Sequence, residues 1–205
     1  MNSRLRSAIQ LARSANMPKE NVERAISKSA ANQSINYDHL RYEGMGPGKI
    51  SVIVETLTDN KNRTASNIRT IFQKYGGSLG TTGIASHNFK QLGIIRIDKK
   101  KISSNDILEI SVNGGAEDCL SNGQYHEVIT AKNNFYKVKL EIEKKIQEFI
   151  SSGIEWLPIN KILLNQEKTK TVLNFLEMLE NDDDIQHVYA NLEIDNNFGE
   201  KILTW

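Results

Sequence analysis

Cysteine is nearly absent from this chain of 205 residues, in which Cys119 stands alone. A single cysteine excludes an internal disulfide and any metal site built from several cysteines, so the chain fits a reducing compartment. Long apolar runs are also missing, and no segment approaches the roughly 20 residues that a transmembrane helix needs. The N-terminus leads directly into a helical pattern and not into a signal-peptide core. We therefore expect a cytoplasmic protein, or a protein of the mitochondrial matrix if its full-length form carries a transit peptide.

Residues in the patterns of catalytic and metal sites are scarce as well. The four histidines lie in four separate segments, and none has a second ligand at a metal-binding spacing. Cys119 has no recognisable activating partner, so we interpret it as a small core residue. The acidic run 180–184 lacks the Gly and Glu of a calcium loop, and we expect it to be solvated, with one Asp capping the turn before Ile185. The sequence thus predicts no enzyme, no metal and no cofactor.

Aromatic residues make up 7% of the chain, with six Phe and two Trp, and no strand carries a regular series of them. Base stacking on an aromatic sheet, as in RRM domains, is therefore not indicated. If the protein binds nucleic acid, we expect it to recognise backbone and shape, or to act through a protein partner.

Charge is distributed very unevenly along the chain. Residues 1–101 contain 17 Lys and Arg against 7 Asp and Glu, a net charge of +10, whereas residues 102–205 contain 9 against 18, a net charge of −9. The formal net charge of the whole chain, +1, conceals this asymmetry. Such a distribution indicates either an anionic partner for the first half or the docking of the two halves on each other.

Two short amphipathic helices are predicted at the N-terminus. The first has its apolar residues at helical spacing, at Leu5, Ala8, Ile9, Ala12 and Ala15. Pro18 suits the first position of the second helix, in which Val22, Ala25 and Ile26 form the expected buried stripe. Basic side chains lie on the other faces, where they either contact nucleic acid or form an ordinary solvated surface.

The pattern beyond a boundary near Asn36 is that of an α+β protein. Residues 50–57 predict a buried strand, and Ala65 to Tyr75 predict a helix that Gly76-Gly77 ends. Further strands are predicted within 84–97, 125–131, 154–164 and 187–194, and further helices around 107–110, 135–150 and 171–179. Pro158 argues for an edge or a bulge in its strand. Strands of this kind with helices on one face predict ferredoxin-like sandwiches.

The glycine cluster Gly44–Gly48 precedes Lys49 and invites comparison with a phosphate-binding loop. The Walker pattern requires glycine where Glu43 stands and Ser or Thr where Ile50 stands, and it follows a strand instead of preceding one. We interpret the cluster as a rigid turn whose backbone N–H groups, together with Lys49, can approach a phosphate backbone.

The turn from Asp59 to Thr64 is the best candidate for an anion site. It places Lys61, Asn62 and Arg63 at a helix N-terminus, where backbone donors and the helix dipole favour an anion. In the alternative interpretation, Asn62 or Thr64 caps the helix, and Lys61 and Arg63 are surface charges. The residue types alone leave both interpretations open.

Several segments together resemble the YebC family, in order and over nearly the whole chain from Asn2 to Ile194. They are Arg4-Leu5-Arg6, 15–26 (ANMPKENVERAI), 42–48 (YEGMGPG), 55–64 (ETLTDNKNRT), 76–80 (GGSLG) and 114–118 (GGAED). The resemblance implies an N-terminal helical domain and two α+β domains, the third inserted in the second. It also implies no enzymatic activity. Family members are described as DNA-binding transcriptional regulators, and others as translation factors, including mitochondrial translational activators and proteins that assist ribosomes on proline-containing stretches.

The resemblance implies the following domains: a partial helical domain 1–36, a discontinuous α+β domain 37–98 with 166–205, and an inserted α+β domain 99–165. The fold expected is therefore a truncated N-terminal helical hairpin with two ferredoxin-like domains, one inserted in the other. Members of the family begin with a Lys- and Arg-rich helical segment upstream of the position of Asn2, which this chain lacks. We expect the helical domain to be incomplete and its nucleic-acid affinity to be weaker.

Our hypothesis is a non-enzymatic regulator of gene expression that grips the backbone of DNA or RNA, alone or within the ribosome, and does not bind membranes. The predicted nucleic-acid-binding residues are Arg6, Arg13, Lys19, Arg24, Lys49, Lys61, Asn62, Arg63, Arg69 and Lys74. The alternative is a protein- or metabolite-binding α+β module without nucleic-acid contact, in which the charge asymmetry serves domain docking. The sequence leaves the target and the oligomeric state open.

Overall fold

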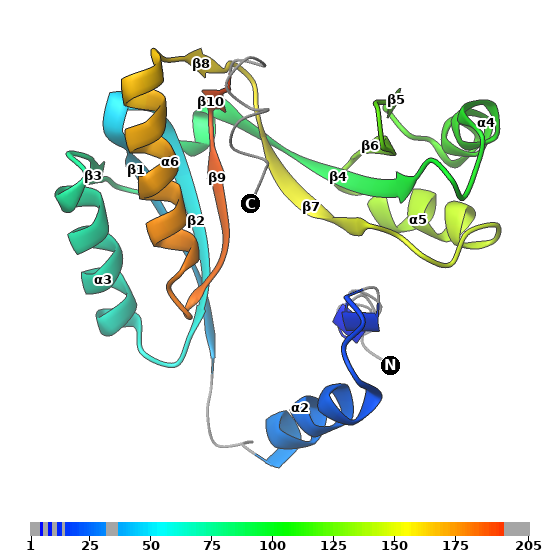
Figure 1. Ribbon diagram of the computed structural model, residues 1–205, viewed down its shortest axis with the longest axis horizontal. Helices are drawn as coiled ribbons and strands as arrows, with labels where there is room; N and C mark the ends of the chain where they lie inside the picture. The colour runs from blue at the N-terminus through cyan, green and yellow to red at the C-terminus, as the bar shows by residue number, and fades with distance from the viewer. Residues whose placement is uncertain (1–4, 6–7, 10–11, 14, 32–36, 195–205) are drawn as a thin grey trace. The chain divides into compact units, whose positions relative to one another are not determined.

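The computed structural model describes residues 5, 8–9, 12–13, 15–31 and 37–194 of the chain (Figure 1). The protein is an α+β protein with antiparallel sheets. It divides into two compact units: unit 1 comprises residues 1–33 and 91–155, and unit 2 comprises residues 34–90 and 156–205. The chain leaves unit 2 within strand β4 (Phe89–Asp98) and returns to it within strand β7 (Ser151–Pro158).

Unit 2 is built on a four-stranded sheet with the order β3-β1-β2-β9. The strands are β1 (Asp38–Met45), β2 (Ser51–Thr58), β3 (Ser78–Leu79) and β9 (Ile185–Ala190). β2 pairs antiparallel with both β1 and β9, so a strand from the C-terminal part of the chain lies beside one from the N-terminal part. A short parallel pair, β8 (Ile162–Leu163) with β10 (Leu192–Glu193), accompanies this sheet.

Two helices, α3 (Lys61–Lys74) and α6 (Gln166–Glu180), cover one face of this sheet (Figure 1). Phe72 of α3 and Phe175 of α6 meet edge to face, with their ring centroids 4.9 Å apart, above the buried strand residues Val52 and Val54. These side chains belong to the apolar, β-branched run 50–57, and the strand predicted there is confirmed as β2.

Unit 1 contains a second four-stranded sheet with the order β5-β6-β4-β7. Its new strands are β5 (Asp118–Ser121) and β6 (Tyr125–Ala131), and its helices are α4 (Ser104–Gly114) and α5 (Phe135–Glu143). Ile107 of α4 and Val138 and Ile142 of α5 are fully buried in one core with strand residues such as Ile95 and Val128. The elements follow each other as β-α-β-β-α-β along the chain.

The N-terminal segment contains helix α2 (Lys19–Ala31), and the described residues among 5–13 are helical as well. Asn16 has a positive φ of 56° at the turn between them. Pro18 was predicted at the first position of this helix, but it lies one residue before it. Its carbonyl accepts the backbone N–H of Val22. The predicted buried stripe is only partly covered, because Val22 is half-buried and Ala25 and Ile26 are exposed.

Two other segments differ from what the sequence indicated. Residues 38–45, which the sequence did not identify as a strand, form β1. The helix predicted over 135–150 ends at Glu143, and Ile150 is 49% exposed. No helix among the described residues is both long and apolar enough to cross a membrane.

Candidate nucleic-acid interface

The start of helix α3 is capped by Asn60, whose side-chain oxygen accepts the backbone N–H of Arg63 at 3.1 Å. Asn62, which the sequence offered as a cap, is exposed within the first turn. Thr64 is buried, and its hydroxyl donates to the Asp184 carboxylate at 2.7 Å. Neither Asn62 nor Thr64 is therefore the N-cap, since the helix begins at Lys61, four residues before Ala65, the first residue of its apolar pattern.

Arg63 is held by two carboxylates of the protein itself. Its guanidinium lies 2.9 Å from Asp184 and 2.9 Å from Asp59, and it contacts both oxygens of Asp184. Burial alone would raise the pKa of Asp184, but the hydrogen bonds from Thr64 and Arg63 outweigh it and lower that pKa. The negative charge that this helix start favours is thus supplied by Asp184, 121 residues after Arg63.

Asp184 belongs to the acidic run 180–184, which the sequence predicted to be solvated. Its side chain is only 14% exposed, so that expectation is wrong for this residue. Asp182 accepts the backbone N–H of Asp184 and thereby shapes the turn before Ile185, as expected for an Asp cap. Lys61, the other cation of the predicted anion site, lies 3.2 Å from Asp38, with both side chains largely exposed.

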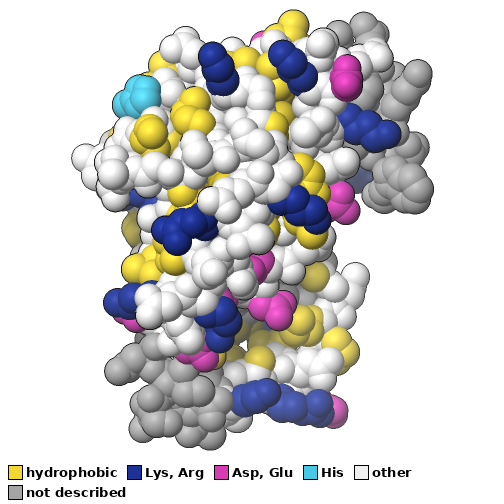
Figure 2. All heavy atoms as spheres, turned by 90° about the vertical axis from the view of Figure 1, so that its left-hand side faces the viewer, with side chains coloured by type: hydrophobic (Ala, Val, Ile, Leu, Met, Phe, Trp, Pro, Cys, Tyr) yellow, Lys and Arg dark blue, Asp and Glu magenta, His cyan; other side chains and the backbone are white. Residues whose placement is uncertain are grey.

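Three predicted cations on unit 2, Lys49, Arg69 and Lys74, are exposed and have no carboxylate partner among the described residues. Lys49 follows the glycine turn and adopts a positive φ of 61°, a strained backbone conformation for a residue with a side chain. Lys74 ends helix α3 and lies over the Tyr75 ring at 5.7 Å. Figure 2 shows the Lys and Arg side chains spread over the side of the molecule that carries α3.

Lys49 and Lys74 lie at the same end of unit 2. A Cβ atom on Gly77, just after α3, would be 2.6 Å from the carbonyl oxygen of Met45 in the glycine segment. A Cβ on Gly48 would be 2.7 Å from Leu164, immediately before α6. The turn 46–49, the end of α3 and the start of α6 therefore meet at one place, which we call the glycine-turn end of unit 2.

The predicted cations of the N-terminal segment have a simpler setting. Arg13, Lys19 and Arg24 are exposed, and Lys19 lies 3.6 Å from Glu23 in a surface ion pair. Arg6 lies outside the described residues. These exposed side chains can contact an anion, but charged side chains on any solvated helix surface are exposed in the same way.

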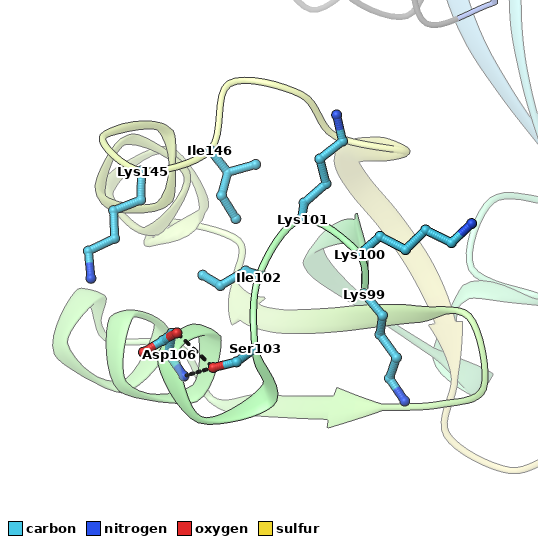
Figure 3. A pocket seen from close by; sticks show the side chains of 8 residues that line it. All are labelled: Lys99, Lys100, Lys101, Ile102, Ser103, Asp106, Lys145 and Ile146. Atoms are coloured by element: carbon cyan, nitrogen blue, oxygen red, sulfur yellow. Dashed lines mark hydrogen bonds between the residues drawn. The ribbon is translucent and has the colours of Figure 1, made fainter.

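A cluster of lysines that the sequence did not single out lines a cavity in unit 1 (Figure 3). The cavity has a volume of about 680 Å³ and is lined by Lys99, Lys100, Lys101, Ile102, Ser103, Asp106, Lys145 and Ile146. Three of its lysines form the run directly after β4. The three consecutive lysines could have been recognised from the sequence. That Lys145, more than 40 residues later, lines the same cavity is known only from the fold.

Part of the charge asymmetry is neutralised inside each unit. Within unit 1, Arg96 lies 2.7 Å from both Glu127 and Glu155, and Lys101 contacts Glu148. Within unit 2, Arg63 is paired with Asp184 as described. Each of these pairs joins a cation of the first half of the chain to an acid of the second half. Ion pairs inside the units therefore account for part of the charge asymmetry between the two halves of the chain. A larger set of exposed cations takes no part in these pairs.

The histidines and the cysteine form no reactive centre in the described part of the chain. No group of three or more His, Cys, Asp or Glu side chains there could hold a metal ion. Cys119 lies on β5, and burial raises the pKa of its thiol, which therefore stays protonated at neutral pH. His126 is buried, with its two ring nitrogens at hydrogen-bond distance from Ser121 and from the carbonyl of Ile102.

Comparisons with known proteins agree over most of the chain. A family model described as the second and third domain of TACO1/YebC matches residues 37–192. A probable transcriptional regulatory protein of Pelagibacter ubique is 58% identical over 197 residues, which are 96% of this chain and 82% of that protein. The crystal structure of a conserved hypothetical protein from Aquifex aeolicus is 39% identical, with a TM-score of 0.83 over 95% of this chain and 81% of the other.

Proposed function

Because the chain belongs to the TACO1/YebC family, a family without enzymatic activity, we propose that it is a regulator of gene expression that binds the backbone of a nucleic acid. The observation that carries the proposal is the 58% identity, over 96% of the chain, to a probable transcriptional regulatory protein. In this proposal the protein regulates transcription by binding DNA, or translation by binding RNA of the ribosome.

The distribution of charge supports contact with an anionic polymer. The first 101 residues carry 17 Lys and Arg, and the structure pairs Arg63, Arg96 and Lys101 with acids of the second half. Exposed cations without a carboxylate partner in the described part of the chain are available to phosphates, which they bind with release of condensed counterions.

Within unit 2, the glycine-turn end is the part of the proposed interface that the geometry favours. Lys49 and Lys74 lie there, and Arg69 precedes Lys74 on the same helix. Lys61 and Arg63 contribute less in this proposal, because Asp38 and Asp184 already neutralise them. The exposed Arg13, Lys19 and Arg24 of the helical segment remain part of the proposal, as does Arg6.

Substitution of the three available cations tests this interface. We expect Lys49→Gln, Arg69→Gln and Lys74→Gln together to weaken binding to labelled duplex DNA and RNA and to flatten the dependence of log Kd on log salt by about 3, because each phosphate contact contributes about one unit of slope. Fluorescence anisotropy across a salt series measures both quantities.

A matched control keeps the number of removed charges equal and takes them from exposed positions of unit 1: Lys132→Gln, Lys137→Gln and Lys144→Gln. If both triple variants lose the same affinity, the effect is one of net charge alone and the glycine-turn end is not an interface. Co-sedimentation with ribosomes, competed by free DNA, distinguishes translation from transcription. Poor competition by DNA indicates a ribosomal target.

One observation favours a second candidate function, a protein- or metabolite-binding module without nucleic-acid contact. The pairs Arg63–Asp184, Arg96–Glu155 and Lys101–Glu148 are the internal charge docking that this alternative requires. It predicts no binding to DNA, RNA or ribosomes even at low salt.

The proposal also covers the fold of unit 1 and the arrangement of the domains. The β-α-β-β-α-β succession of unit 1 and its strand order β5-β6-β4-β7 support a ferredoxin-like domain. The pairing of β9 with β2 supports a discontinuous domain that an inserted domain interrupts. The bounds expected from the family, 37–98 with 166–205 and 99–165, stay a prediction.

A further inference from the structure

We propose that the lysine-lined cavity of unit 1 is a second contact site for the phosphodiester backbone of a nucleic acid. The inference rests on the proposed function for the identity of the partner, and it adds a site whose lining includes none of the predicted binding residues. Four lysines line the cavity, and Asp106 is the one carboxylate among its lining residues.

The carboxylates around the cavity are engaged in ways that leave three lysines available. Asp106 accepts a hydrogen bond from the Ser103 hydroxyl at 2.7 Å, at the start of α4. Glu148 pairs with Lys101 alone, and Asp98 accepts the backbone N–H of Lys100 at 2.8 Å. The described residues offer no ion-pair partner for the ammonium groups of Lys99, Lys100 and Lys145.

The backbone that carries the lysines is held in place by hydrogen bonds. Lys101 donates its N–H to the carbonyl of Asp98, and Lys99 donates its own to Gln124. The buried His126 lies 3.1 Å from the carbonyl of Ile102, the next residue of the same turn. A fixed turn presents its side chains from constant positions, so less conformational entropy is lost when they bind a ligand.

The arrangement of the side chains favours a polymer with several phosphates. In Figure 3, Lys99, Lys100 and Lys101 leave their turn in different directions, Lys145 extends from the other wall, and Ile102 and Ile146 lie between the two walls. Diverging ammonium groups cannot converge on one small anion. A backbone that carries a phosphate at every nucleotide can meet them one by one, and each contact releases counterions.

The test removes the two lysines of the turn and compares them with two lysines outside the cavity. We expect Lys99→Gln plus Lys100→Gln to weaken binding to labelled duplex DNA or RNA about tenfold at about 0.1 M salt and to reduce the salt slope by about 2. The control, Lys132→Gln plus Lys137→Gln, removes the same charge from exposed positions of unit 1. Equal losses in both variants would overturn the proposal.

Lys145 provides a sharper comparison, because only the fold connects it with the lysine run. We expect Lys145→Gln to weaken binding further in the background of the first variant, whereas Lys137→Gln in that background does not. Acetylation of surface lysines, read by mass spectrometry, gives an independent measure: bound oligonucleotide should protect Lys99, Lys100 and Lys145 and leave Lys137 reactive. Unchanged reactivity of the cavity lysines would contradict the site.

The outcomes separate this inference from the proposed function. If the unmodified chain binds no nucleic acid at low salt, both fail. If it binds and the cavity variant binds equally well, only the cavity site fails. If the cavity variant instead loses binding to vesicles containing phosphatidylserine and keeps its nucleic-acid affinity, the ligand is a membrane surface and the inference is overturned.

Discussion

Glu43 illustrates at the scale of single residues how a buried charge can fix a loop. Its side chain is buried, and its Oε2 accepts the backbone N–H groups of Gly83, Ala85 and Ser86 at 2.8–3.0 Å. Its Oε1 lies 3.1 Å from the Arg41 guanidinium, an ion-pair contact whose geometry falls short of a hydrogen bond. The loop 83–86 is therefore attached to β1 through one carboxylate.

We expect Glu43→Gln to lower the free energy of unfolding by about 1–3 kcal/mol, because the amide loses the charge and its NH2 group must face either the three backbone N–H groups or the Arg41 guanidinium, which are all donors. Burial alone would raise the pKa of Glu43, but the backbone hydrogen bonds outweigh it and lower that pKa. The stabilisation is thus complete above the ordinary pKa of about 4.3 and disappears as the pH falls through the lower folded value. Urea unfolding at pH 7 and below pH 4 measures this difference.

The exposed Glu177 on α6 offers a control for the loss of one negative charge. If Glu43→Gln destabilises the protein no more than Glu177→Gln, or if the difference between Glu43→Gln and the unmodified protein is the same at both pH values, the carboxylate does not hold the loop.

The start of α3 shows why a binding site predicted from cationic residues in the sequence can include residues that are already neutralised in the fold. Lys61 and Arg63 have the residue types and the position of an anion site, and both were predicted on that ground. The carboxylate that neutralises Arg63 lies 121 residues later, so only the fold brings it into contact. Lys49 and Arg69, which have no such neighbour among the described residues, were predicted on weaker evidence.

At the scale of elements, the periodicity of apolar residues identified most of the helices and strands. α3 and α6 were predicted because their buried residues recur at the helix period. β2 was predicted because its residues are mainly apolar and β-branched. β1 was not predicted because charged residues and Gly44 interrupt its apolar residues. α5 ends earlier than predicted, since Ile146 and Phe149 are buried outside a helix.

The contact between β1 and α3 depends on Gly44. A Cβ atom at this position would lie 2.6 Å from the Phe72 ring and 2.6 Å from the carbonyl oxygen of Ser78. We expect Gly44→Ala to lower the free energy of unfolding by about 1–3 kcal/mol, because the helix or strand β3 must move away. Urea denaturation followed by circular dichroism measures the loss.

Gly153 is a strand glycine on β7 whose added Cβ would meet nothing within 4 Å. Gly153→Ala should leave stability unchanged or raise it by up to about 1 kcal/mol, since alanine restricts the unfolded chain. Similar losses in the two alanine variants would mean that close packing at Gly44 is not the cause.

At the scale of the whole molecule, the charge asymmetry of the sequence had two explanations, an anionic partner and the docking of the two halves of the chain. The structure contains elements of both. Some cations of the first half are neutralised inside each unit, while exposed lysines and arginines stay available on both units. The lysine cavity could not be predicted from spacing, because only the fold of unit 1 places Lys145 in the lining of the same cavity as Lys99–Lys101. The domain boundaries 1–36, 37–98 with 166–205, and 99–165 stay a prediction beside the two compact units.

The central claim is that this chain binds the backbone of a nucleic acid. Its most direct test is the affinity of the unmodified chain for a labelled duplex DNA and for a structured RNA, measured by fluorescence anisotropy between about 50 and 200 mM salt. We predict binding at the lowest salt, with log Kd rising linearly with log salt at a slope of about 3 or more, since several phosphate contacts form together. Absence of binding at about 50 mM salt, or an affinity that does not respond to salt, would contradict the account.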